Sequence, residues 1–197
     1  MNLVFASNNA HKLSEVRQIM PSELTILSLH DIGFEQEIEE NGLTLEQNSA
    51  IKAEAVDAFV RTHQSVIGIP IDGVFADDTG LEIDALDGKP GVYTARWAGE
   101  PAANRAKALR ELEGKTDRGA QFRTVITLIK ANGERVAVSG IVRGSIATEE
   151  YGQGGFGYDP VFIPEGYDKT FGELPAELKN HISHRARALE ELVKIVK

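Results

Sequence analysis

The sequence predicts an α/β fold in which helices flank a mixed central β-sheet. Short apolar runs of strand length alternate with segments of helical period along the 197 residues. One hairpin signal interrupts this alternation, because Asn132-Gly133 separates two stretches rich in β-branched residues. An antiparallel hairpin within an alternating order favours a mixed sheet. The length suits one well-buried core, so we expect a single domain over residues 1–197.

The first expected elements are a strand at residues 2–6 and a helix that follows a polar turn. Apolar residues recur at helical spacing between Leu13 and Met20. The turn from Ser7 to Lys12 would place the N–H groups of a first helical turn beside a lysine, which suits an anion. A surface helix capped by asparagine explains this turn equally well.

A second helix is expected from Thr44 to about Arg61, because Thr44 and Gln47 have the form of a capping box. Asn48 and Lys52 lie on one face of this helix, which is polar near its start and becomes apolar at Ala55 and Phe59. Both side chains can therefore point into a pocket whose floor is the core. A lysine that extends along a surface helix is the ordinary alternative.

Two adjacent carboxylates, Asp77 and Asp78, follow an apolar run and precede Thr79 and Gly80. We interpret them as an active-site corner at a strand end, since one carboxylate can hold a hydrated cation while another accepts a proton from water. The glycine would allow a sharp turn. A solvated Asp-rich turn is the ordinary alternative. Neighbouring strand residues point to opposite faces, which favours one primary catalytic carboxylate and leaves Asp77 secondary or structural.

The remaining elements follow from period and turn residues. We expect a loop at 63–73, a strand at 81–84, a turn at 88–91, a helix at 102–112 and hairpin strands at 122–129 and 134–146. The glycine-rich segment 151–160 either presents Phe156 and Tyr158 at a surface or packs them inward. After Pro175, Ser183 either caps a new helix or lies inside one long helix.

The composition excludes several classes of protein. A net charge of −9 argues against binding to nucleic acid or to an anionic membrane. No apolar run reaches a membrane span and the start lacks the basic residues of a signal peptide, so we expect a cytoplasmic protein. The chain has no cysteine, and its five histidines are scattered, so sulfur and imidazole sites for a metal are not expected. The remaining candidate ligands are oxygen atoms, which favour magnesium or manganese. An anionic ligand would need a local group of lysines and arginines.

Several motifs occur in order along nearly the whole chain. They are Ser7-x-Asn9-x-x-Lys12, Glu40 before Gly42-Leu43-Thr44, Asn48 with Lys52, Ala76-Asp77-Asp78-Thr79-Gly80-Leu81, Pro90-Gly91-Val92-Tyr93, Gly155-Phe156-Gly157-Tyr158-Asp159-Pro160 and Ser183-His184-Arg185. Together they resemble the inosine triphosphate pyrophosphatase family, also called Ham1-like or non-canonical purine nucleoside triphosphate pyrophosphatases. The chain departs from the usual pattern at Asn8, where many members have glycine, at Thr79, where many have serine, and at 68–73, which is longer than common.

This resemblance implies an elongated, bilobed domain with the nucleotide site in the cleft between the lobes, and a homodimer. It implies magnesium-dependent hydrolysis of ITP, dITP and XTP to the monophosphate and pyrophosphate, which would keep these nucleotides out of DNA and RNA. Asp78 would be the general base that activates water. Asp78 and Glu40 would hold one or more Mg²⁺ ions per subunit, and Mn²⁺ could substitute.

The resemblance also implies the substrate-binding residues. Ser7, Asn9, Lys12, Lys52 and Thr79 would line the triphosphate, with Asn48 nearby and Asn8, Ala10 and His11 in the same substrate-binding turn. Phe156, Gly157, Tyr158 and Asp159 would hold the base, with Phe156 stacked on the purine, and Lys179, His184 and Arg185 would complete base and phosphate contacts. Donors to the 6-keto edge would discriminate against adenine.

Three other interpretations remain open at this point. Asp78-Thr79-Gly80 resembles the aspartic-protease signature, although such proteases pair two of these loops in an all-β fold. A Maf-like pyrophosphatase would share the reaction and act on other nucleotides, but the Phe156 loop and Ser183-His184-Arg185 argue against it. A nucleotide-binding module without turnover would have little use for Asp78, Glu40 and Lys12 together.

Overall fold

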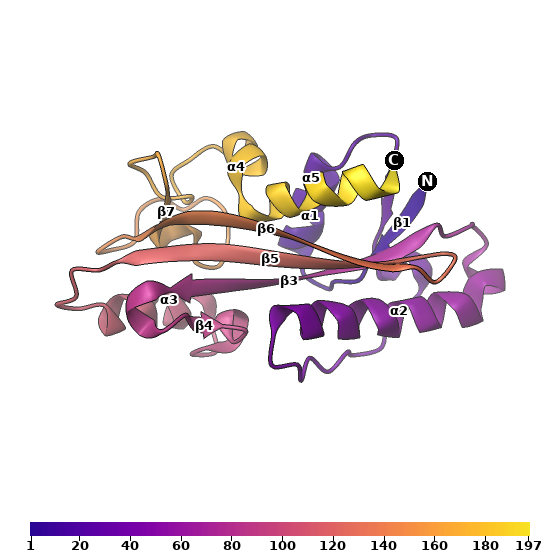
Figure 1. Cartoon of the computed structure of the whole chain (residues 1–197), viewed down its shortest axis with the longest axis horizontal. Coiled ribbons are helices and arrows are strands. Elements are labelled where there is room, and N and C mark those ends of the chain that lie inside the picture. Colours follow the sequence, from indigo (N-terminus) through magenta and orange to yellow (C-terminus); the bar gives the residue numbers. More distant parts are fainter. The chain divides into compact units, whose positions relative to one another are not determined.

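The computed structural model describes residues 1–197 and shows two compact units. Unit 1 consists of residues 1–78, 125–139 and 188–197, and unit 2 consists of residues 79–124 and 140–187. Four elements continue from one unit into the other: β3 (Gly73–Ile83), β5 (Gly119–Lys130), β6 (Arg135–Ile146) and α5 (His184–Val196). Figure 1 follows the chain through both units by colour.

The strands form a seven-stranded mixed sheet with the order β2-β1-β3-β5-β6-β7, and β4 pairs with β3. Strand β1 (Asn2–Phe5) is parallel to β2 (Thr25–Leu27) and to β3, with Phe5 opposite Phe75. Strand β4 (Lys89–Gly91) is antiparallel to β3, and strand β7 (Phe162–Pro164) is antiparallel to β6. The expected mixed α/β fold is confirmed.

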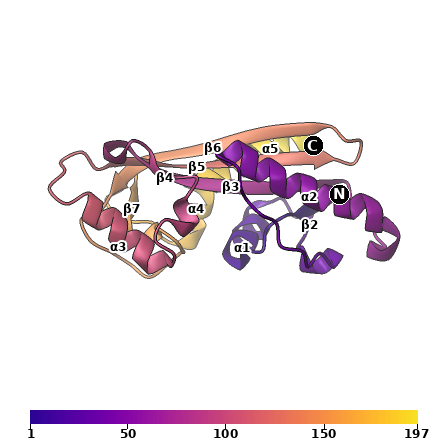
Figure 2. The ribbon, with the colours of Figure 1, turned by 90° about the horizontal axis from the view of Figure 1, so that it is seen from below.

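In unit 1 the side chains of each strand alternate between two helical layers. Phe5 and Phe75 pack with α1 (Ala10–Ile19) and α5, whereas Val74 and Ala76 pack with α2 (Leu45–Ile67). Figures 1 and 2 show α2 along one side of these strands, and Figure 1 shows α1 and α5 on the other. Because side chains alternate along a strand, residue parity on β3 decides which helix a side chain faces.

The expected end of the second helix at about Arg61 is wrong, and the expected loop at 63–73 is confirmed only for residues 68–72, between the end of α2 and the start of β3. Helix α2 continues to Ile67 and ends at Gly68, which has a φ of 76° and whose N–H donates to the Gln64 carbonyl. Most residues after Val60 are exposed, so the apolar period fades while the backbone stays helical. A left-handed glycine then terminates the helix, as is common at helix C-termini.

The expected corner at the aspartate pair is wrong in its backbone. Strand β3 runs without a break from Gly73 to Ile83, so the separate strand expected at 81–84 is the end of the same strand. Asp77 and Asp78 lie inside this strand, and Gly80 is a buried strand residue rather than a sharp turn. The polar doublet had suggested a strand end because interior strand positions of a buried sheet are usually apolar.

The hairpin of β5 and β6 is confirmed, but its turn differs from the expected two-residue form. Lys130 N donates to the Glu134 carbonyl and Gly133 N donates to the Lys130 carbonyl. The bonded pair of Lys130 and Glu134 therefore encloses three residues, 131–133, and Gly133 takes a φ of 87° while Asn132 keeps a negative φ. This hydrogen-bond pattern with a left-handed glycine is typical of the three-residue loop, the next most common hairpin connection.

Unit 2 has its own apolar core, which includes Leu81, Phe122, Tyr158 and Phe162. The expected helix at 102–112 is confirmed as α3 (Pro101–Glu111). Residues 150–158 form neither helix nor strand, as expected of the glycine-rich segment. Short 3₁₀ helices occupy His30–Ile32, Asp84–Leu86, Thr94–Arg96 and Asp159–Val161. The helices offer no segment with the length and apolarity needed to cross a bilayer.

The open question at Ser183 is resolved in favour of a new helix. Helix α4 (Ala176–Ile182) ends at Ser183, and α5 begins at His184. The Ser183 hydroxyl accepts a hydrogen bond from Ala186 N at 3.1 Å, which is the contact of an N-cap. His184 and Arg185 therefore stand in the first turn of α5.

Candidate active site

The aspartate doublet on β3 is divided between the two helical layers of unit 1. Asp77 has the parity of Phe75, and its Oδ1 lies 2.9 Å from Lys12 Nζ of α1. Asp78 has the parity of Ala76, and its Oδ1 lies 3.6 Å from Lys52 Nζ of α2. Strand alternation thus assigns one carboxylate to each lysine.

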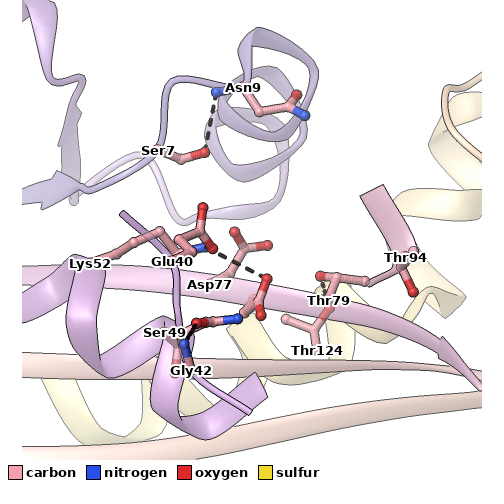
Figure 3. Close-up of polar contacts among 12 residues, drawn as sticks. Ser7, Asn9, Glu40, Gly42, Ser49, Lys52, Asp77, Thr79, Thr94 and Thr124 are labelled. Carbon is pink, nitrogen blue, oxygen red and sulfur yellow. Dashed lines mark hydrogen bonds and ion pairs between the residues drawn. The ribbon is translucent and has the colours of Figure 1, made fainter. Parts of the chain in front are cut away.

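Lys52 connects Glu40 and Asp78 on the α2 side. Its Nζ donates to Glu40 Oε2 at 2.7 Å, and Figure 3 shows the Lys52 and Glu40 side chains directed toward one another. The side chain of Lys52 is 10% exposed, so it does not extend along the surface, whereas that of Glu40 is 33% exposed. Asp78 Oδ2 is buried and accepts no hydrogen bond. One oxygen of this carboxylate is therefore available to a proton, a metal ion or a water molecule.

Two pKa values in this cluster are raised, that of Asp78 chiefly by burial and that of Lys52 by neighbouring carboxylates. Burial raises the pKa of Asp78, the negative charges of Glu40 and Asp77 add to this effect, and Lys52 and Lys12 oppose it. Burial alone would lower the pKa of Lys52, but the charges of Asp78, Asp77 and Glu40 outweigh it and raise that pKa. The lysine stays cationic, and the carboxylate holds a proton more readily than an exposed aspartate does.

The first turn of α2 holds the segment that carries Glu40. The buried Asn48 Oδ1 accepts a hydrogen bond from Gly42 N at 2.8 Å, and Gln47 Oε1 accepts one from Leu43 N at 2.6 Å. Thr44 Oγ1 accepts from Gln47 N at 3.1 Å, which confirms the cap, although Gln47 bonds to Leu43 rather than back to Thr44. A Cβ at Gly42 would lie 2.6 Å from Asn48 Oδ1, so this position has no room for a side chain.

The turn between β1 and α1 is built as an N-cap. Asn9 Oδ1 accepts from Lys12 N at 3.1 Å. Asn9 N donates to Ser7 Oγ at 3.2 Å, the contact drawn in Figure 3. Asn8, Ala10 and His11 are exposed on this turn. The structure therefore brings Lys12 to Asp77 and leaves the other polar residues of the turn at its surface.

In unit 2, Thr79 belongs to a hydroxyl pair with a buried arginine beside it. Thr79 Oγ1 and Thr124 Oγ1 are 2.7 Å apart (Figure 3), and Arg185 Nη2 donates to Thr79 Oγ1 at 3.3 Å. Arg185 is only 1% exposed. Thr124 was not expected from the sequence, although its place on the alternating strand that pairs with β3 could have indicated it.

The loop residue Phe156 lies beside two cations of unit 2. Lys179 Nζ is 4.7 Å from the centre of the Phe156 ring, and the Arg185 guanidinium carbon is 5.8 Å from it. Asp159 Oδ2 accepts hydrogen bonds from Phe156 N at 2.8 Å and from Lys179 Nζ at 2.6 Å. One carboxylate oxygen thus links the lysine to the backbone of the aromatic residue.

The two aromatic residues of the glycine-rich loop have different surroundings. Phe156 is partly buried, whereas Tyr158 is 4% exposed, packs in the core of unit 2 and donates its hydroxyl to the Thr94 carbonyl at 2.9 Å. Burial raises the pKa of Tyr158 well above its ordinary value. The His184 ring stacks on Phe122 with centroids 4.6 Å apart. Tyr158 and His184 therefore both have structural contacts in this unit.

The carboxylates of unit 1 fit a magnesium ion. Glu40 and Asp78 offer oxygen ligands on either side of Lys52, and Asp78 Oδ2 is buried without a hydrogen bond. No group of three or more His, Cys, Asp or Glu side chains could hold a metal by itself. This donor set suits Mg²⁺, which commonly takes one or two carboxylates and completes its shell with water and phosphate oxygens.

Comparison with known proteins identifies the family. The Ham1 family model matches residues 3–195. This chain belongs to the Ham1 family. A dITP/XTP pyrophosphatase of Flavobacterium johnsoniae is 46% identical over 199 residues, covering 100% of this chain and 98% of that protein. The dITP/XTP pyrophosphatase of Bacillus subtilis is 45% identical over 199 residues, covering 98% and 96%.

Solved structures agree with this membership. The Ham1 protein of Staphylococcus aureus has a TM-score of 0.84 with 38% identity, covering 100% of this chain and 98% of that chain. The Ham1 protein of Coxiella burnetii has a TM-score of 0.84 with 35% identity and the same coverage. The resemblance found in the sequence is therefore confirmed, and the aspartic-protease interpretation of Asp78-Thr79-Gly80 is wrong.

Proposed function

We propose that this Ham1-family protein hydrolyses non-standard purine nucleoside triphosphates, namely ITP, dITP and XTP, to the monophosphate and pyrophosphate. The full-length relatives named dITP/XTP pyrophosphatase support the substrate class. The observation that carries the chemistry is the buried, unpartnered Oδ2 of Asp78 beside Lys52 and Glu40. A carboxylate of raised pKa that keeps one oxygen available has the properties of a general base.

The residues of unit 1 act on the triphosphate in this proposal. Asp78 accepts the proton of the attacking water, and Lys12 and Lys52 stabilise the charge that grows on the pyrophosphate leaving group. Ser7, Asn9 and the first turn of α1 bind phosphate oxygens, since helix N-termini favour anions. A magnesium ion held by Glu40 and Asp78 would supply further positive charge at the phosphates.

The residues of unit 2 recognise the base in this proposal. Phe156 stacks on the purine, and Lys179 and Arg185 donate toward its oxygen-bearing edge while Asp159 holds Lys179 in place. A site built of donors rejects adenine, because its 6-amino group would leave buried donors unpaired. Thr79 adjoins Asp78 in the chain and binds phosphate through its hydroxyl.

The wider setting of this activity is also proposed. Two copies form a homodimer, the chain acts as one domain over residues 1–197, and no nucleic acid or membrane takes part. Its place is the cytoplasm, where nucleotide precursors are made and where removal of ITP, dITP and XTP keeps them out of DNA and RNA. The net charge of −9 supports the absence of a nucleic-acid partner.

The decisive experiment incubates the protein with ITP, dITP, XTP, ATP and GTP, with magnesium or with EDTA, and resolves all phosphate products. Monophosphate plus pyrophosphate from the first three, in magnesium only, is the expected result. Asp78→Asn should lower turnover at least a hundredfold while nucleotide binding is retained. Diphosphate plus phosphate would reject the proposed bond, and binding without turnover would favour a nucleotide-binding module.

A further inference from the structure

A side chain of α3 reaches the glycine-rich loop of unit 2. Arg105 Nη1 donates to the carbonyl of Gly157 at 2.9 Å, and Arg105 Nε lies 3.0 Å from Glu150 Oε1. The Arg105 side chain is 17% exposed, whereas that of Glu150 is 42% exposed. Both α3 and the segment before β7 belong to unit 2, whose elements are seen in Figure 2. Arg105 thus connects α3 to Glu150, just before the loop, and to Gly157 at the tip of the loop.

The loop requires such support because its backbone is unusual. Gly152, Gly155 and Gly157 all have positive φ, and a Cβ at Gly155 would lie 2.0 Å from Asp159 Oδ2. Glycine gives the backbone these dihedrals but leaves it more conformational freedom than any other residue. A run of glycines therefore needs contacts from outside to hold one conformation.

Contacts at the two sides of the loop leave its tip to be fixed separately. Tyr151 N donates to the Pro160 carbonyl at 2.8 Å, and Gly154 N donates to the Gly172 carbonyl at 2.9 Å. The Phe156 N–H donates to Asp159 Oδ2. Beyond Phe156, the carbonyl of Gly157 is held by Arg105. Asp159 N also donates to the Phe156 carbonyl at 3.1 Å. Asp159 therefore holds the backbone of Phe156 at its N–H and at its carbonyl, and Arg105 holds the next carbonyl, that of Gly157.

A cavity beside this contact makes Arg105 hard to replace. It has a volume of about 290 Å³ and is lined by Arg105, Glu150, Phe156, Gly157 and neighbouring glycines of the loop. Removing the guanidinium would enlarge this space rather than bring another side chain to the Gly157 carbonyl. Lysine is a poor substitute, because its flexible ammonium lacks the rigid, planar guanidinium that directs an N–H at the Gly157 carbonyl.

We propose that Arg105 is a positioning residue for base recognition, which holds the Gly157 carbonyl and so fixes the ring of Phe156 for stacking on the purine. This inference rests on the proposed function, because it assigns the loop to the base. Arg105 acts through the loop and not on the phosphates. Its loss should therefore weaken binding of the purine end of the substrate and leave the chemistry at the phosphates intact.

The test compares Arg105→Ala, Arg105→Lys and the matched control Arg110→Ala, which removes an exposed arginine from the same helix. Three quantities are measured in the full chain: kcat and KM for ITP, inhibition by inorganic tripolyphosphate, which lacks a base, and hydrogen exchange of the amides of residues 155–158. For Arg105→Ala we expect KM to rise about tenfold with kcat within about twofold, since a hydrogen bond from a charged group is lost.

The same variant should bind tripolyphosphate as the unaltered chain does, and its loop amides should exchange faster. For Arg105→Lys, KM and the exchange rates should lie between those of Arg105→Ala and those of the unaltered chain. Arg110→Ala should change none of the three quantities. An unchanged KM and unchanged exchange in Arg105→Ala would overturn the inference, and so would equal losses of ITP and tripolyphosphate binding, which indicate general damage. If the unaltered chain does not hydrolyse ITP, the proposed function fails, and the exchange rates alone decide whether Arg105 fixes the loop.

Discussion

Lys179 Nζ lies 2.6 Å from Asp159 Oδ2, and the two side chains are 5% and 4% exposed. The same oxygen accepts the N–H of Phe156. Removing one partner of a buried ion pair leaves a charge without compensation, which is strongly destabilising. We therefore predict that Asp159→Asn lowers the free energy of unfolding by about 3 to 5 kcal/mol, measured by urea denaturation.

The matched control for this prediction is the exposed pair of Asp84 and Arg143 in the same unit, whose side chains are 40% and 46% exposed. Asp84→Asn should cost about 1 kcal/mol or less, because solvent screens exposed pairs. Equal losses in the two variants would show that the burial of the Lys179 pair does not matter.

Asp78→Asn should stabilise the metal-free protein while it abolishes turnover. Burial raises the pKa of Asp78 in the folded chain above its ordinary value of 3.8, so the ionised form opposes folding at neutral pH. In EDTA at about pH 8 the variant should melt at a higher temperature than the unaltered chain. The difference should narrow as the pH falls through the raised pKa and vanish below 3.8, where both states of the unaltered chain are protonated. A variant that melts lower at neutral pH would contradict this direction.

Lys52→Met should impair catalysis and move its pH dependence. Lys52 lowers the pKa of Asp78 against the effect of burial, so its removal raises that pKa further and shifts the acidic side of the rate profile to higher pH. Loss of one charge at the phosphates should reduce kcat/KM by about a hundredfold or more. Lys194→Met, at a side chain that is 65% exposed, is the control and should change neither quantity. A lower rate with an unshifted pH profile would show that Lys52 does not control the pKa of Asp78.

Gly42 and Asn48 should be coupled in a double-mutant cycle. Gly42→Ala places a Cβ 2.6 Å from Asn48 Oδ1 and should displace the segment that carries Glu40. The expected results are a lower melting temperature and a higher magnesium concentration for half-maximal rate. Asn48→Ala removes the clashing oxygen, although Gln47 Cβ stays 2.7 Å from the new Cβ, so the double variant should lose less than the sum of the single variants. Additive losses would show that Asn48 Oδ1 is not the source of the clash and would point to Gln47 Cβ instead.

The sequence was sufficient where local chemistry decides the structure. Thr44 and Gln47 predicted the start of α2, Ser183 offered an N-cap, and the period of residues 122–129 predicted β5. The parity of neighbouring strand residues also favoured one primary carboxylate, and Asp78 and Asp77 do lie against different lysines. These features depend on contacts over a few residues or on a simple alternation.

The sequence was insufficient where burial by distant segments decides. Strand β3 continues through Asp77 and Asp78 because lysines from α1 and α2 compensate their charges, and no local pattern reports those partners. Strands β2 and β7 have three residues each, too short for a detectable period. The contact of Arg105 with Gly157 joins residues 52 positions apart. Such contacts become visible only in three dimensions.

The contacts of Asp77 with Lys12 and of Asp78 with Lys52 also depend on the register of β3. If β3 slipped by one residue against β1, every side chain would change face, so Asp77 would turn toward α2 and Asp78 toward α1. Depending on the direction of the slip, either Asp78 would take the place of Asp77 or Asp77 the place of Asp78. In either case one of Lys12 and Lys52 would lose its carboxylate from β3, while Phe75 would enter the layer of α2. A misaligned strand is thus penalised in charge and in packing together, so the residues proposed for catalysis also help the chain reject a wrong alignment as it folds.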